Sequence, residues 1–308
     1  MSYGYDGPRP TSASWSGTVS GSIQWSYDND LAVAQESVCD AASNCNPIAF
    51  GYDNDKLLTT AGDETLSRDP QNGLLSATNV GSIGDSWSYN TFGEPATYTA
   101  SFNGSPIFAQ SYTRDDGGRI TTKSETISGV SSTTTYGYDT AGRLTTVITN
   151  GTTTASYTYD QNSNRLTKNT EAGVYDAEDR MLSYNGTTYT YTGNGELQTK
   201  TDSTGTTSYS YDELGNLMSV TKPDGTQIEY VIDGQNRRVA KKVNGTITQR
   251  LIYSDALRPA ATLDSSGNVD ERFVYASRSN VPDLIYKGGN TYRVISDHLG
   301  SPRLIVDV

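Results

Sequence analysis

A short motif recurs along this chain of 308 residues and constrains its fold more than any other feature. Each copy has an aromatic residue, any residue, Tyr, Asp, a few polar residues, Gly or Asn, Arg or a polar residue, and Leu. The clearest copies place their defining residues at Tyr136, Tyr138, Asp139, Gly142 and Arg143, at Tyr157, Tyr159, Asp160 and Arg165, and at Tyr209, Tyr211, Asp212 and Gly215. Weaker copies are centred on Tyr27, Tyr52, Tyr89, Tyr112, Tyr191 and Ile232. Such recurrence indicates a repeat architecture.

The motif predicts a strand, a tight turn and a second strand. Aromatic residues at i and i+2 lie on one face of a strand, so Tyr136 and Tyr138 should point together. Rings from neighbouring strands should stack into a ladder, with their hydroxyls reaching water or a backbone carbonyl. The Asp should accept hydrogen bonds from amides of the turn, and Gly or Asn should take the left-handed conformation. We expect the Arg to pair with that Asp and the Leu to return to the buried face.

A second class of turn lies between the motifs. Asn-Gly pairs begin at Asn103, Asn150, Asn185 and Asn244, and each pair lies between runs rich in Thr, Tyr and Val. An Asn-Gly pair in such a setting is the strongest short-range signal for a β-hairpin. Asp224-Gly225 and Ser266-Gly267 are interpreted as weaker equivalents. Turns of two classes that alternate predict an all-β chain, an antiparallel meander of hairpins. The segment 30–39 fits either two helical turns or a strand.

The composition favours thin sheets whose faces are partly exposed to solvent. The chain has 22 Tyr against five Phe, and its hydrophobic content is only 34%. The net charge of −12 disfavours nucleic acid and anionic membranes as partners, because both require clustered Lys and Arg. No stretch is long and apolar enough to insert into a membrane, and the first residues do not resemble a signal peptide. We expect the chain to be a segment of a longer polypeptide at both ends.

Cys39 and Cys45 are the only cysteines. They fit a loop disulfide in an exported protein and two free thiols equally well. The segment between them lacks the further ligands that a metal site needs, since the one His lies at position 298. We therefore predict no metal and no cofactor.

The chain resembles the Rhs/YD-repeat family. The resemblance covers residues 1–308 and rests on the motif copies, on the run from Arg68 to Leu75 with the later run from Trp87 to Glu94, and on a segment similar to the start of the Rhs-associated core. That core-like segment contains Asp297, Gly300, Pro302 and Arg303. We accordingly divide the chain into divergent repeats with the cysteine loop (1–110), regular repeats (111–290) and the start of the core segment (291–308).

The resemblance implies that the repeats form a curved, spiralling sheet that is part of a hollow β-shell, as in bacterial Rhs toxins, the cocoon subunits of insecticidal toxin complexes and the teneurins. In the bacterial toxins, the core segment plugs the shell and ends in an aspartyl autoprotease that releases a C-terminal toxin inside the cavity. The present chain stops before that cleavage region. The resemblance therefore assigns no catalytic role to Asp297 or Asp307.

Other chemistry has weak support in the sequence. His298 has no recognisable nucleophile partner and is interpreted as a turn residue. Asp53 and Glu64 have the outer spacing of a calcium loop, but Leu57 and Leu58 stand where a ligand and the turn glycine belong. The Asn-Gly turns match the glycosylation pattern and are already explained as hairpins.

We therefore predict a non-enzymatic shell segment of an Rhs-type toxin, secreted or at the cell surface. Its partners would be the rest of its own polypeptide, with its shell and the enclosed toxin domain. The alternative is a surface adhesin or carbohydrate-binding repeat protein whose exposed Tyr residues contact glycans. Unpaired sheet edges predict self-association when the piece is expressed alone.

Overall fold

The computed structural model describes all 308 residues and consists of strands and turns, without a helix. The predicted all-β class is confirmed. The chain folds into two compact units: unit 1 comprises residues 1–109, 230–242 and 246–308, and unit 2 comprises residues 110–229 and 243–245. No helix is present that could span a membrane.

The first part of unit 1 contains ten strands and the start of an eleventh. They are β1 (Ser2–Asp6), β2 (Arg9–Trp15), β3 (Gly21–Tyr27), β4 (Val33–Asp40), β5 (Cys45–Tyr52), β6 (Leu58–Ala61), β7 (Glu64–Arg68), β8 (Leu75–Val80), β9 (Ile83–Tyr89), β10 (Pro95–Phe102) and β11 (Ser105–Arg114).

Unit 2 contains the end of β11 and the strands that follow it. They are β12 (Ile120–Ile127), β13 (Val130–Tyr138), β14 (Leu144–Thr149), β15 (Thr152–Tyr159), β16 (Arg165–Lys168), β17 (Glu171–Tyr175), β18 (Met181–Tyr184), β19 (Thr187–Tyr191), β20 (Leu197–Asp202), β21 (Gly205–Tyr211), β22 (Leu217–Thr221) and the first residues of β23 (Gln227–Ile232).

The chain then returns to unit 1. Its last strands are β24 (Arg238–Val243), β25 (Thr246–Tyr253), β26 (Pro259–Leu263), β27 (Val269–Val274), β28 (Leu284–Lys287), β29 (Asn290–Ser296) and β30 (Pro302–Asp307).

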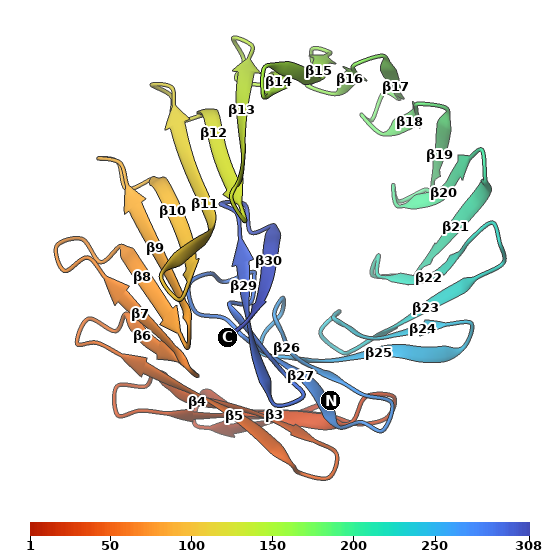
Figure 1. Ribbon diagram of the computed structural model, residues 1–308. Helices are drawn as coiled ribbons and strands as arrows, with labels where there is room; N and C mark the ends of the chain where they lie inside the picture. The colour runs from red at the N-terminus through yellow and green to blue at the C-terminus, as the bar shows by residue number, and fades with distance from the viewer. The chain divides into compact units, whose positions relative to one another are not determined.

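Successive strands pair antiparallel, as predicted, and Figure 1 shows them following one another in chain order within each unit. The register shifts at the second Tyr of the motif, for example between Gly137 and Tyr138 and between Thr158 and Tyr159. The cause is the turn that follows. In the turn after Tyr138, the Gly142 amide donates to the Asp139 carbonyl, and Gly142 has a φ of 81°. A left-handed glycine after a tight turn produces this bulge.

The Asn-Gly pairs form the second class of turn. Asn150 and Gly151 have φ values of 50° and 80°, so both central residues are left-handed, as a two-residue hairpin loop requires. The prediction that Asp224-Gly225 and Ser266-Gly267 form turns of this second class was wrong. Each glycine closes a turn of the first class: Gly225 donates to the Lys222 carbonyl, and Gly267 donates to the Asp264 carbonyl. The two classes therefore do not alternate strictly along the chain.

The ambiguous segment 30–39 is a strand in the structure. It falls mainly within β4, which pairs with β3 on one side and β5 on the other. The preceding turn explains the choice, because the Asp28 carboxylate accepts the amides of Asp30 and Ala32 and so directs the chain back along β3.

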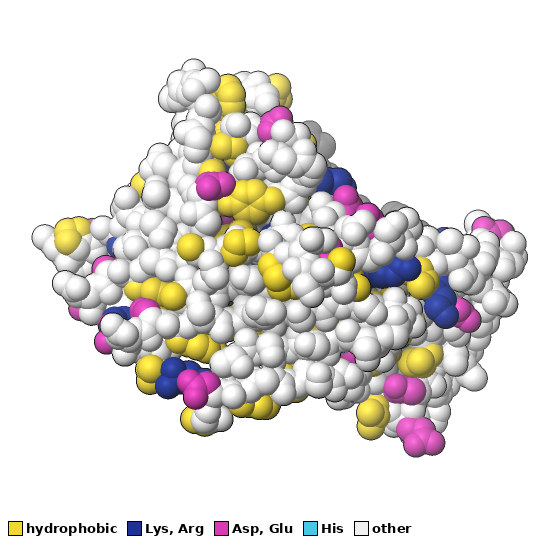
Figure 2. All heavy atoms as spheres, turned by 90° about the horizontal axis from the view of Figure 1, so that it is seen from below, with side chains coloured by type: hydrophobic (Ala, Val, Ile, Leu, Met, Phe, Trp, Pro, Cys, Tyr) yellow, Lys and Arg dark blue, Asp and Glu magenta, His cyan; other side chains and the backbone are white.

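Hydrophobic packing is concentrated in unit 1. One cluster joins β2, β3 and β4 to β24, β25 and β26, around Ile23, Val38 and Ile252. A second joins β5, β6, β8 and β9 to β27 and β28, around Ile83 and Leu284. In unit 2 the buried apolar residues are only Tyr112, Ala155 and Val220. On the face drawn in Figure 2, apolar side chains form small separate groups between polar atoms. The strands of unit 2 must therefore be held together mainly by other contacts.

Candidate functional site

The Asp of each motif organises its turn. The Asp139 Oδ1 accepts the backbone amides of Ala141 and Arg143, both at 2.9 Å, and its Oδ2 accepts Nε of Arg143 at 2.7 Å. The backbone amide of Arg143, followed by its side chain, holds the pKa of Asp139 below its usual range. The carboxylate is thus kept ionised at the turn.

The Arg also connects each repeat to the next. The Arg143 guanidinium lies over the ring of Tyr159, 4.9 Å from its centroid, and donates to the Asp160 carbonyl at 2.8 Å. The Tyr159 hydroxyl in turn donates to the Leu144 carbonyl at 2.7 Å. One Arg therefore contacts its own turn and the following repeat.

The same contacts recur along unit 2. Arg119 lies over Tyr138 at 5.0 Å and Arg180 over Tyr191 at 5.4 Å, and both Tyr hydroxyls donate to carbonyls of the preceding repeat. We predicted that the Tyr rings of neighbouring strands would stack on one another. At these positions the guanidinium of an Arg packs on the Tyr ring instead. The electrostatic attraction between a cation and a ring face explains why the Arg takes this position.

Two of the clearest motif copies replace the Arg of the turn by Asn. The Asp160 carboxylate is bonded by Asn164 at 3.0 Å, and the Asp212 carboxylate by Asn216 at 2.8 Å. Arg165 comes one position later and lies over the rings of Tyr157 and Tyr184.

The remaining motif residues are placed as follows. Tyr136 and Tyr138 lie on β13, Tyr209 and Tyr211 lie on β21, and Gly215 closes its turn with a φ of 80°. The Leu of the second copy departs from our expectation: Leu166 is 37% exposed, because unit 2 has no thick core for it to enter.

The core-like segment forms a turn of the same kind. The Asp297 Oδ1 accepts the amides of Leu299 and Ser301, both at 3.0 Å, and Gly300 has a φ of 86°. His298 lies inside this turn, and Pro302 and Arg303 begin β30. The carboxylate of Asp297 is therefore engaged in capping the β29–β30 turn.

Cys39 and Cys45 form a disulfide that links β4 to β5. Between them, the Asp40 carboxylate accepts the Ala42 and Asn44 amides and the Asn44 side chain. The cysteines thus flank a turn built like those of the repeats.

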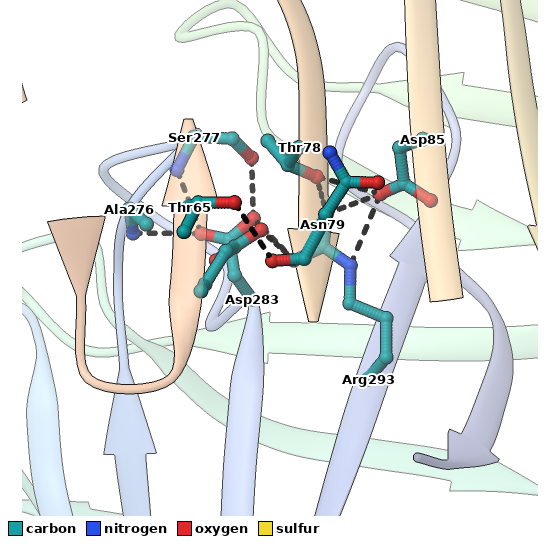
Figure 3. Close-up of polar contacts among 9 residues, drawn as sticks. Thr65, Thr78, Asn79, Asp85, Ala276, Ser277, Asp283 and Arg293 are labelled. Atoms are coloured by element: carbon teal, nitrogen blue, oxygen red, sulfur yellow. Dashed lines mark hydrogen bonds and ion pairs between the residues drawn. The ribbon is translucent and has the colours of Figure 1, made fainter. Parts of the chain in front are cut away.

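A buried charged cluster in unit 1 was missed by the sequence analysis. Arg293 of β29, 2% exposed, projects toward Asp85 of β9 and Asp283 just before β28 (Figure 3). Its Nη1 lies 3.0 Å from Asp283 Oδ1 and 2.8 Å from Glu64 Oε1, and its Nη2 is paired with Asp85. Thr78 Oγ1 lies 3.3 Å from Nη2. No sequence pattern marks these residues, because they come from distant hairpins.

Three carboxylates thus share one guanidinium. Glu64 is fully buried, and although one oxygen is close to Arg293, neither oxygen has hydrogen-bond geometry with a partner. Burial raises the pKa of Glu64 to about 8, against the opposing attraction of Arg293. Below that pH Glu64 is protonated, and the cluster then carries one net negative charge instead of two.

A cavity of about 430 Å³ lies elsewhere in unit 1. Trp25, Phe50, Tyr52 and Tyr275 contribute aromatic walls, and the lining also includes one carboxylate, Glu36, and three arginines, Arg258, Arg272 and Arg278. Polar groups fixed in an aromatic cavity of this size are typical of small-molecule sites.

Comparisons with known proteins agree with this architecture. The family model described as Teneurin YD-shell matches residues 1–308. Human Teneurin-1 is 27% identical over 54% of the chain, and Teneurin-3 of Danio rerio is 26% identical over 61%. The chain spans only 6% and 7% of the length of these relatives.

Solved structures show the same fold at low sequence identity. TcdB2-TccC3-Cdc42 matches with a TM-score of 0.63 at 13% identity, over 94% of this chain and 16% of that one. The Photorhabdus luminescens Tc holotoxin pore with the TccC3-D651A mutation matches with a TM-score of 0.53 at 13% identity, over 93% of this chain and 17% of that one.

Proposed function

The chain belongs to the Teneurin YD-shell family, and on that premise we propose that it is a wall segment of a larger shell that encloses a C-terminal toxin domain before delivery. The role of the family is structural. Enclosure of a toxin, and a location outside the producing cell or on its surface, are the specific parts of the proposal.

The observation that carries the proposal is the contact pattern between successive repeats. Arg143 holds the turn of its own repeat, covers Tyr159 of the next and bonds the following turn. Because these contacts repeat along the sheet, strands are joined without a thick apolar core. A thin sheet of this kind can divide an interior from the solvent, which is what an enclosing wall requires.

The alternative, a carbohydrate-binding repeat protein, has support in a different part of the molecule, the aromatic-lined cavity of unit 1. The two functions can be tested separately, because Asp139, Arg143 and Tyr159 lie in unit 2 and the cavity residues all lie in unit 1.

Limited proteolysis of the full-length polypeptide tests enclosure. We expect the region after Val308 to resist protease in the intact protein and to be digested when the wall is weakened by Asp139→Ala with Asp160→Ala. The control is Asp116→Ala, at an exposed position of the β11–β12 turn. A downstream region digested equally fast in the intact and weakened proteins would overturn the proposal.

A further inference from the structure

The aromatic cavity of unit 1 has a fixed polar group on one wall. The Glu36 carboxylate accepts Nε1 of Trp25 at 3.1 Å through one oxygen, and the Ser254 hydroxyl at 3.1 Å and Nη2 of Arg272 at 2.6 Å through the other. Arg272 is 2% exposed and donates its other terminal nitrogen to the Ala260 carbonyl. These bonds fix the orientation of the Trp25 indole, so its ring is held in place before any ligand arrives.

A second wall is formed by Tyr275. Its hydroxyl donates to the Pro259 carbonyl at 3.0 Å, and the Arg258 guanidinium lies 5.5 Å from its ring centroid. Arg258 is paired with Asp255 at 2.6 Å. Two of the three arginines of the cavity are thus neutralised by carboxylates, Arg258 by Asp255 and Arg272 by Glu36.

Arg278 is the third, and its pairing is different. It donates through Nη1 to the backbone carbonyl of Asp297 and has no carboxylate partner. Its charge is therefore not balanced by a paired carboxylate. A guanidinium that lacks one, in an aromatic cavity, leaves a positive charge and free N–H donors for a ligand.

We infer that this cavity binds a sugar acid, a pyranose ring that carries a carboxylate. The carboxylate pairs with Arg278, and the apolar C–H face of the ring packs on the aromatic walls of Trp25 and Tyr275. The volume of about 430 Å³ suits one or two such rings. The Ser254 and Ser277 hydroxyls and the Glu36 carboxylate provide acceptors for the hydroxyls of the sugar. The inference does not depend on toxin enclosure.

Calorimetric titration of the full chain with glucuronate tests this inference, with glucose and benzoate as matched probes. Glucose has the same ring without the carboxylate, and benzoate has the carboxylate on a flat ring. We expect saturable binding of glucuronate and binding of glucose weaker by about tenfold or more, the effect of losing a charge-assisted pair. Absence of glucuronate binding, equal affinity for glucose, or tighter binding of benzoate would each overturn it.

Arg278→Gln should weaken glucuronate binding about tenfold or more and leave the affinity for glucose unchanged. Arg303→Gln, which removes an exposed positive charge from β30, is the control and should bind like the original chain. Unchanged glucuronate affinity in Arg278→Gln would contradict the assignment of Arg278. Should that variant unfold, the comparison of glucuronate with glucose on the unmodified chain still decides the inference.

Discussion

Nη1 of Arg293 lies 2.8 Å from Oε1 of Glu64, although the two residues come from strands far apart in the chain, β29 and β7. Both side chains are buried, and Asp85 and Asp283 share the same guanidinium. The contact joins β29, at the start of the core-like segment, to the hairpins of residues 64–85. The cluster therefore fixes the C-terminal strands of unit 1 against its early repeats.

Glu64→Gln should remove a pH dependence of stability. The pKa of Glu64 is raised by burial from 4.5 to about 8, so the folded state holds a proton that the unfolded state releases above about 4.5. This stabilisation is complete below pH 4.5 and is lost progressively as the pH rises to about 8. Between pH 6 and pH 8 we expect the original chain to lose on the order of 2 kcal/mol, about 3 °C in Tm.

Thermal unfolding followed by circular dichroism at both pH values measures this difference. Glu64→Gln should show little of it, and Glu213→Gln, at an exposed position of unit 2, should behave like the original chain. Parallel pH profiles for all three proteins would show that Glu64 does not bind this proton.

Arg293→Met should be strongly destabilising. The substitution keeps an unbranched side chain but leaves the buried carboxylates of Asp85 and Asp283 without their cation. Breaking a buried pair in this way costs about 3–5 kcal/mol. Urea unfolding at pH 7 measures the loss, with Arg303→Met on β30 as the exposed control. A loss no larger than that of the control would mean that the cluster contributes little.

Asp139→Ala should weaken its hairpin, because the carboxylate bonds two turn amides and Arg143. The pKa of Asp139 is lowered, so its contribution is present above the unfolded value of 3.8 and is lost as the pH falls through the lower folded value. Amide hydrogen exchange across β13 and β14 should accelerate. Asp116→Ala serves as control, and exchange that is equally slow in both variants would argue against the role of Asp139.

Tyr159→Phe tests the connection between repeats. It removes the bond from the hydroxyl to the Leu144 carbonyl and keeps the ring under Arg143. We expect a loss of about 1 kcal/mol, the usual contribution of one such bond. Arg143→Gln should cost more, since it removes the contact with the ring together with the bonds to both turns. If the two variants were equally stable, Arg143 would not join the repeats.

Reduction of the Cys39–Cys45 disulfide should have a modest effect. The loop that it closes is short, which limits the entropic stabilisation to about 2 kcal/mol. The turn inside it is also held by Asp40, which keeps its three hydrogen bonds after reduction. Unfolding of Cys39→Ser with Cys45→Ser, compared with the oxidised chain, measures the difference. Complete loss of the fold would show that Asp40 cannot hold the turn alone.

The sequence by itself determined the local structure, because its causes lie within a few residues. Asp139, Gly142 and Arg143 form one turn through contacts four positions apart, and Asn150-Gly151 forms another through its left-handed φ values. The all-β class and the antiparallel meander follow from such turns. The turn class of Asp224-Gly225 was predicted wrongly, because both classes contain a glycine and differ only in the residues before it.

Tertiary structure alone decided which distant side chains meet. The packing of Arg143 on Tyr159 depends on neighbouring hairpins lying in register, and the pairing of Glu64 with Arg293 depends on how far-separated hairpins pack within unit 1. An isolated Glu or Arg has no local signature of burial. Its pKa and its partner arise only when folding removes water from around it.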